Sequence, residues 1–113
     1  MAKRYVPDAG DVVWLQFNPQ AGHEQAGHRP ALVLSPAVYN GKTGLMVCCP
    51  MTTNVKGYPF EVPVTGGRNG VALADQVKSL DWKVRMAKRK GRATAEELAE
   101  VRAKAVALIE GPK

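Results

Sequence analysis

Turn-forming residues interrupt this chain at short intervals, and their spacing restricts the possible folds more than any other feature. Breaks fall, for example, at Asn18-Pro19, Asn40-Gly41 and Gly66-Gly67. The apolar runs between such breaks are of strand length and rich in β-branched and aromatic residues; they cover residues 12–17, 31–34, 45–49, 60–64, 71–74 and 77–80. Many short strands with close turn signals predict a small antiparallel barrel or sandwich. Pro63 marks the fourth run as an edge strand or a strand end.

One clear helix is predicted near the C-terminus. Thr94 and Glu97 have the spacing of a capping box, and Gly111-Pro112 ends the helix. Its apolar face, predicted to pack on the core, consists of Leu98, Val101, Ala105, Leu108 and Ile109. A further helical turn is predicted at residues 35–39. The chain therefore belongs to the mainly β class, with α+β character.

Size and cysteine content indicate one small intracellular domain. A chain of 113 residues is expected to fold as a single domain, residues 1–113, with a modest core. Its cysteines, Cys48 and Cys49, are neighbours, so an ordinary disulfide between them would be strained and reduced thiols are expected. With two histidines and no CxxC motif, no metal site or cofactor is predicted. No apolar stretch is long enough for a membrane span, so a soluble cytoplasmic protein is expected.

The charge balance favours a polyanionic partner. The formal net charge is +6 and the pI is about 9.6. Six cationic residues crowd ten positions of the chain: Lys83, Arg85, Lys88, Arg89, Lys90 and Arg92. Such an excess is typical of nucleic-acid-binding proteins, although a solubilising surface explains it as well.

Two polar segments flank the apolar run at residues 31–34. The first, residues 24–30, brings together Glu24, His28 and Arg29, that is, a carboxylate, an imidazole and a guanidinium. The second, residues 50–59, carries Thr52, Thr53 and Lys56. Both segments are bounded by glycine or proline, so they are interpreted as loops at the ends of a rigid strand, which is where small folds build sites.

The two segments resemble the MazF/PemK toxins of bacterial toxin–antitoxin systems. The resemblance covers nearly the whole chain and includes residues 4–8, 10–11 and 70–79, in the family's order. It implies an SH3-like antiparallel β-barrel with a C-terminal helix. It also implies a homodimeric endoribonuclease (an mRNA interferase) that cuts single-stranded RNA, stops translation and growth, and is neutralised by a small acidic, MazE-like antitoxin.

RNA cleavage by its own 2′-OH requires aligned attack, two proton transfers and stabilisation of a charged phosphorane. Arg29 is the main catalytic candidate because its planar donor fork fits a phosphate. The match of Thr52 to the family's paired-threonine motif makes its hydroxyl a second donor. Glu24 and His28 both remain candidates for the general base.

The remaining candidates would bind RNA rather than react with it. Lysines meet phosphates, glutamine reads base edges, and an aromatic ring can stack on an unpaired base. Phe17 fits stacking and barrel core equally well. The complete RNA-binding set is Phe17, Gln25, Thr53, Lys56, Gln76 and Lys78.

Two other functions stay open at this stage. A toxin of the same fold can poison DNA gyrase through its surface without cutting RNA, and a basic barrel can bind RNA without catalysis. The combination of Glu24, His28 and Arg29 with the Thr52-Thr53 pair favours the endoribonuclease.

Overall fold

The computed structural model describes residues 5–17, 27–66 and 70–112. Its elements, in chain order, are β1 (Asp11–Phe17), β2 (Gly27–Val33), α1 (Ala37–Thr43), β3 (Leu45–Thr52), β4 (Glu61–Val64), β5 (Gly70–Leu73), β6 (Lys78–Asp81), β7 (Lys88–Arg92) and α2 (Ala95–Glu110). The strands form one antiparallel sheet in the order β4-β5-β3-β2-β1-β7, and β6 also pairs with β3.

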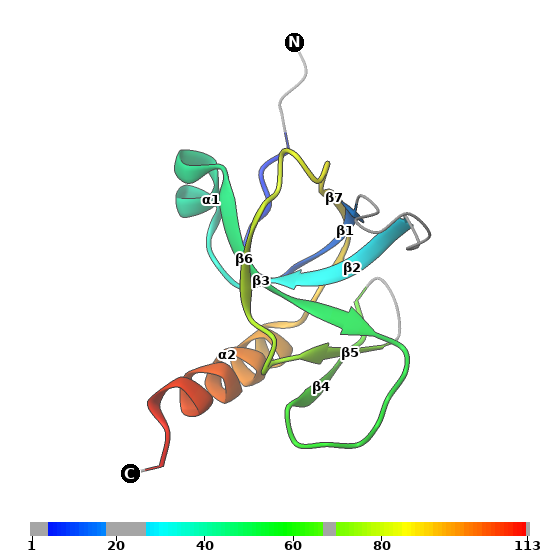
Figure 1. Ribbon diagram of the computed structural model, residues 1–113, viewed down its shortest axis with the longest axis vertical. Coiled ribbons are helices and arrows are strands. Elements are labelled where there is room, and N and C mark those ends of the chain that lie inside the picture. The colour runs from blue at the N-terminus through cyan, green and yellow to red at the C-terminus, as the bar shows by residue number, and fades with distance from the viewer. Residues whose placement is uncertain (1–4, 18–26, 67–69, 113) are drawn as a thin grey trace.

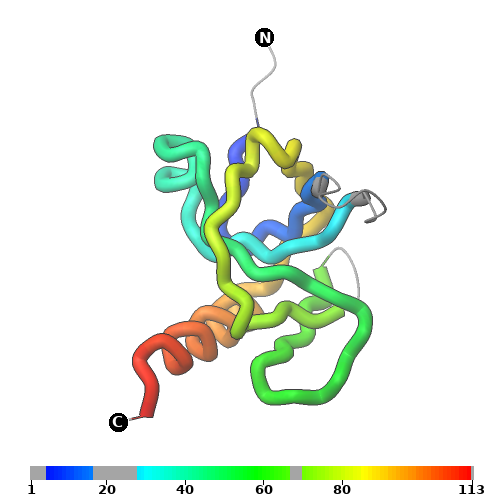
Figure 2. The backbone as a smooth tube through the Cα atoms, viewed as in Figure 1, coloured from blue at the N-terminus to red at the C-terminus, as the bar shows by residue number. Residues whose placement is uncertain are grey.

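The sheet curls into a half-barrel, with α2 packed beneath it (Figure 1). The same view as a tube shows that the β3–β4 connection makes a wide excursion before the chain returns beside β5 (Figure 2). This confirms the predicted mainly β fold with a C-terminal helix. Pro63 lies on β4, an outer strand of the sheet, where a missing backbone donor costs least.

Strands β1, β2 and β3 separate two apolar cores, one on each face of the sheet. The first core includes Val12, Leu32 and Met51 and lies toward β4, β5 and α2. The second includes Val13, Ala31 and Cys48 and lies toward β6 and the segment after it. Because both faces are covered, consecutive residues of these strands are buried, and the sequence shows continuous apolar runs there instead of alternation.

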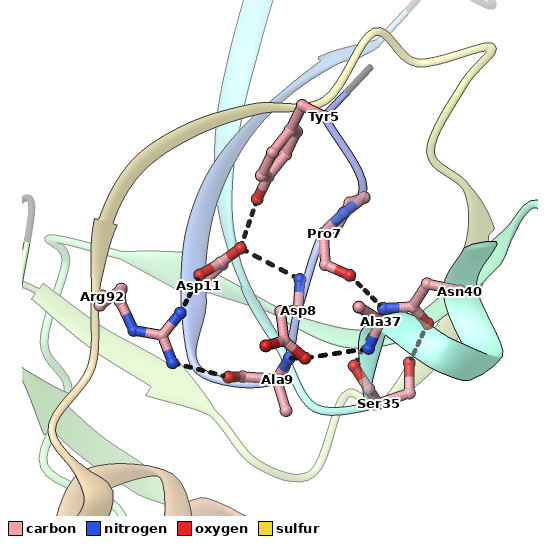
Figure 3. Close-up of polar contacts among 9 residues, drawn as sticks. All are labelled: Tyr5, Pro7, Asp8, Ala9, Asp11, Ser35, Ala37, Asn40 and Arg92. Carbon is pink, nitrogen blue, oxygen red and sulfur yellow. Dashed lines mark hydrogen bonds and ion pairs between the residues drawn. The ribbon is translucent and has the colours of Figure 1, made fainter. Parts of the chain in front are cut away.

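A polar network joins the N-terminal segment to β1, β7 and α1 (Figure 3). The buried Asp11 carboxylate accepts hydrogen bonds from Tyr5 Oη at 2.5 Å and Arg92 Nη1 at 2.6 Å. Asn40, which is fully buried, donates to the Pro7 carbonyl and accepts from Ser35 Oγ. Throughout the described residues, no buried side-chain polar atom lacks a hydrogen-bond partner.

The C-terminal helix confirms the capping box but corrects the predicted apolar face. Thr94 Oγ1 accepts from the Glu97 N–H, and the Glu97 carboxylate accepts from the Thr94 N–H. Val101 is buried, whereas Leu108 is 48% exposed and Ile109 is 77% exposed. The last turns of α2 extend past the sheet (Figure 1), so among the described residues no surface covers them.

Other boundaries also differ from the prediction. The turn predicted at residues 35–39 is helix α1, which continues to Thr43. Strand β7 was not predicted, since its sequence, KRKGR, has no apolar alternation. No helix of the described residues is long and apolar enough to cross a membrane.

Candidate nucleic-acid cleavage site

Arg29 and His28 lie on a strand, not on the loop that the sequence predicted. β2 begins at Gly27, and the β1–β2 register pairs His28 with Gln16 and Arg29 with Leu15. Hydrogen bonds to β1 hold this segment extended, so polar residues that read as a loop are part of the sheet. Neighbouring residues of a strand point to opposite faces, and the two candidate side chains are therefore separated by the sheet.

Arg29, Thr52 and Lys78 belong to one face of the sheet. Paired residues share a face, and so do alternate residues of one strand. Ala31 pairs with Pro50, which places Arg29, Ala31, Pro50 and Thr52 on the same side. Cys48 pairs with Lys78, which adds the lysine to this group. We call the side of the sheet that carries Arg29, Thr52 and Lys78 the cationic face; the buried residues on this side form the second core.

The pairing of β2 with β3 ends near the site. Its last pair is Ala31 with Pro50, and two more residues in the same register would bring Arg29 opposite Thr52. Beyond that pair, β3 is paired with β5 through Met51 and Thr52. Strands β2 and β3 separate from each other at this point, as Figure 1 shows. A guanidinium and a hydroxyl thus flank the point where the sheet opens.

The Thr52 hydroxyl is oriented by the backbone that follows it. Its Oγ1 accepts a hydrogen bond of 3.0 Å from the Asn54 N–H. A hydroxyl can accept and donate at once, so its own proton stays available for a second acceptor. On the other side, Gly70 approaches so closely that a Cβ there would lie 2.9 Å from the Thr52 carbonyl oxygen. These contacts hold Thr52 in position, and its hydroxyl still has a proton to donate.

His28 lies against Trp14 on the opposite face. The two rings meet edge to face, with centroids 6.3 Å apart. Lys90 Nζ lies 5.6 Å from the centroid of the same indole. The imidazole therefore belongs to an exposed aromatic and cationic cluster that is separate from Arg29 and Thr52. This position does not favour a direct proton-transfer role for His28.

The cysteines are unsuited to covalent chemistry. Burial raises the pKa of Cys48 to about 11, although the cationic Lys78 and Arg85 nearby oppose the shift. Burial also raises the pKa of Cys49 to about 12. Both thiols stay protonated at neutral pH, and a thiol is a poor nucleophile. Neither cysteine forms a disulfide.

Arg85 is a functional candidate that the sequence reasoning did not single out from the basic run. It is half-buried, and its charge acts on Cys48 beside Lys78. Its carbonyl oxygen accepts from the Gln16 N–H at 2.8 Å, which ties the segment before β7 to the end of β1. No signal in the sequence set it apart from the other cations of that run.

The other predicted residues divide into two groups. Thr53, Lys56 and Gln76 are exposed on the loops after β3 and β5. Glu24 and Gln25 lie outside the described residues, and for Phe17 only the backbone, at the end of β1, is described. In the described segments no group of three or more His, Cys, Asp or Glu residues could hold a metal ion.

The fold and this face together define a small curled β-sheet protein with a cationic site at the opening between two strands. A family model described as the PemK-like, MazF-like toxin of type II toxin–antitoxin systems matches residues 8–109. The chain belongs to this family, which confirms the resemblance that its motifs indicated.

Two relatives and one solved structure match this chain over nearly their full length. The endoribonuclease toxin MazF of Escherichia coli (strain K12) is 58% identical over 110 residues, covering 96% of this chain and 99% of the relative. The endoribonuclease toxin ChpB of the same strain is 38% identical over 117 residues, covering 97% and 100%. A crystal structure of MazE–MazF (form II) from Deinococcus radiodurans superposes with a TM-score of 0.91 at 58% identity, covering 96% of this chain and all, 100%, of that one.

Proposed function

We propose that this protein is a sequence-specific, metal-independent endoribonuclease toxin that cuts single-stranded RNA. The general activity follows from relatives at 58% and 38% identity that are named endoribonucleases. The chemistry and the site residues are our inference. The observation that carries it is the shared face of Arg29 and Thr52 at the opening between β2 and β3.

The proposed reaction is an attack of the 2′-OH on the adjacent phosphorus. The 2′-oxygen forms a bond to phosphorus, the bond to the 5′-oxygen breaks, and the products are a 2′,3′-cyclic phosphate and a 5′-OH. One proton leaves the 2′-OH and one reaches the departing 5′-oxygen. Charge grows on the non-bridging oxygens in between, so donors aimed at them accelerate the step.

Arg29 and Thr52 are assigned to those oxygens. A guanidinium offers a planar pair of donors and keeps its charge at cellular pH, so electrostatic stabilisation suits it better than proton transfer. The oriented Thr52 hydroxyl has one proton left to donate. Lys78, on the same face, would meet a neighbouring phosphate. Glu24 is our candidate for the general base, with His28 second because of its place beside Trp14.

The proposal extends to location and partners. As a cytoplasmic toxin that stops translation, the protein would need an inhibitor, and the superposed Deinococcus radiodurans structure is a MazE–MazF complex. We infer a MazE-like acidic antitoxin for this chain too, and a homodimer as the active form. Single-stranded RNA is the proposed substrate, because unstacked bases and an accessible 2′-OH are needed.

Purified protein incubated with a single-stranded RNA and EDTA tests the activity. The expected result is cleavage with a 2′,3′-cyclic phosphate on the upstream product. Binding without cleavage would replace the proposal by a non-catalytic RNA-binding barrel. Inhibition of DNA gyrase with intact RNA would replace it by the gyrase-poisoning function.

A further inference from the structure

The loop between β3 and β4, residues 53–60, lacks helix and strand but is tied down by side chains around it. The Glu61 carboxylate uses both of its oxygens on this loop. Its Oε2 accepts from the Lys56 N–H at 2.9 Å, and its Oε1 accepts from the Gly57 N–H at 2.8 Å. Two consecutive amides held by one carboxylate define the backbone at the middle of the loop.

Two further contacts attach the loop to other elements. Tyr58 Oη donates to Asp75 Oδ1 at 3.2 Å, which joins the loop to the turn between β5 and β6. Lys104 Nζ, on α2, donates to the Pro59 carbonyl at 2.5 Å. Asp75 precedes Gln76, whose N–H donates to the Leu73 carbonyl. The β3–β4 loop and the β5–β6 turn are thereby held as one unit.

The surface of this unit has the chemistry of a reader of unpaired bases. Lys56 and Gln76 are exposed, and the apolar Val55 is 59% exposed between two polar neighbours. A cation suits phosphate, an amide suits base edges, and an exposed apolar side chain suits the face of a base. The loop starts directly after Thr52, so this surface continues from the proposed cleavage site.

Two acidic residues lie in this unit, next to the surface that is proposed to bind RNA. Glu61 and Asp75 place two negative charges on a surface that is proposed to bind a polyanion, in a chain of net charge +6. Both carboxylates are used as acceptors for groups of the loop itself. Their unfavourable effect on RNA binding is offset if they remove the entropy cost of ordering the loop when RNA binds.

We propose that Glu61, Tyr58 and Asp75 are positioning residues that preform the β3–β4 loop and the β5–β6 turn as the surface that selects the RNA sequence. This inference rests on the proposed RNA cleavage. It makes these residues determinants of KM and of site choice, while Arg29 and Thr52 determine the rate of the chemical step.

The test compares Glu61→Ala with Glu96→Ala on a long single-stranded RNA whose wild-type cut sites are mapped first. Glu96 is an exposed carboxylate in the first turn of α2, so the control makes the same change of net charge. Glu61→Ala is expected to raise KM about tenfold and to reduce the preference for the main cut site by a similar factor, with kcat within about twofold of wild type. Glu96→Ala is expected to leave all three unchanged.

Smaller changes keep the test valid if Glu61→Ala fails to fold. Tyr58→Phe removes one hydroxyl and is expected to raise KM about threefold. Asp75→Asn retains an acceptor oxygen and is expected to keep the wild-type cut pattern, whereas Asp75→Ala is expected to match Tyr58→Phe. Equal KM and cut pattern in Glu61→Ala and Glu96→Ala, or a loss confined to kcat, would overturn the positioning role. No cleavage by wild-type protein would instead overturn the proposed function, and this role with it.

Discussion

At the scale of single residues, Arg29 carries the strongest prediction. Arg29→Ala is expected to lower the single-turnover cleavage rate about 100- to 1,000-fold, because a donor that meets growing charge in the transition state is lost. Its exposed position on β2 means that folding should be unaffected. Cleavage rates and thermal melting of the purified variant measure both effects. A wild-type rate in this variant would remove Arg29 from the site.

His28 and Glu24 are separated by their pH–rate profiles. Since His28 packs on Trp14 across the sheet from Arg29, His28→Ala is expected to keep the rate within about threefold and to leave the profile unchanged. Glu24→Gln is expected to lower the rate and to abolish the acidic limb of the profile. If His28→Ala abolished that limb instead, the imidazole would be the general base.

At the scale of elements, closure of the half-barrel depends on Gly66. A Cβ on Gly66 would lie 1.6 Å from the Arg92 carbonyl oxygen, so the end of β4 or the end of β7 must move. Gly66→Ala is expected to cost about 2–4 kcal/mol of unfolding free energy. Gly41→Ala is the matched control, because a Cβ there meets only Val6 Cγ1 at 3.6 Å. Within α1 it is expected to be neutral or stabilising by up to about 1 kcal/mol. Urea unfolding of both variants measures the difference, and equal midpoints would show that the close approach is not maintained in solution.

The Glu97 carboxylate joins Thr65, after β4, to Thr94, before α2, and its charge makes this link depend on pH. Burial alone would raise the pKa of Glu97, but hydrogen bonds from Thr94 and Thr65 outweigh it, and the pKa is lowered. A lowered folded-state pKa adds stability above the unfolded-state pKa, and this stability is lost as the pH falls through the folded-state value. Wild type is therefore expected to be more stable than Glu97→Gln at pH 7, with the difference shrinking below about pH 4. Urea midpoints across this range test it, with Glu96→Gln as the control. A constant difference would assign the effect to packing instead of charge.

The elements also show how far the sequence could predict the fold and the site. Apolar runs located six strands, and the capping box located the start of α2, because burial and local hydrogen bonding leave local patterns. β7 and the first half of β2 were missed, since their polar residues are held in the sheet by pairing with β1, a contact distant in sequence. The same cause separated His28 from Arg29: proximity in sequence predicted one site, and strand alternation placed them on two faces. Glu61, Tyr58 and Asp75 had no signal, because their contacts appear only when the loops meet.

At the scale of the whole molecule, exposed apolar side chains predict that two copies of the chain associate. Apolar side chains remain exposed on α2 and on the segment after β6, among them Val84 at 70% and Ile109 at 77%. Such surfaces are commonly covered by a second copy, and two-fold dimers are the most frequent assembly. Sedimentation at micromolar concentration is expected to show a dimer of the 12.2 kDa chain. A monomer alone would contradict this.

The positive charge of the protein also predicts how its RNA cleavage is inhibited. The net charge is +6, and two of the cations, Arg29 and Lys78, lie on the cationic face. Single-stranded RNA and an acidic, flexible antitoxin segment would both be attracted to this surface. RNA affinity is expected to fall with salt at a log–log slope of about −0.7 for each phosphate contacted.

The antitoxin should compete with RNA for the surface around Arg29, Lys56 and Lys78, and it should lose part of its own affinity at high salt. Titrating antitoxin into the protein with a bound, non-cleavable RNA analogue measures the competition. Simultaneous binding without mutual weakening would rule out direct occlusion and require an allosteric route, since two ligands of one site cannot bind independently.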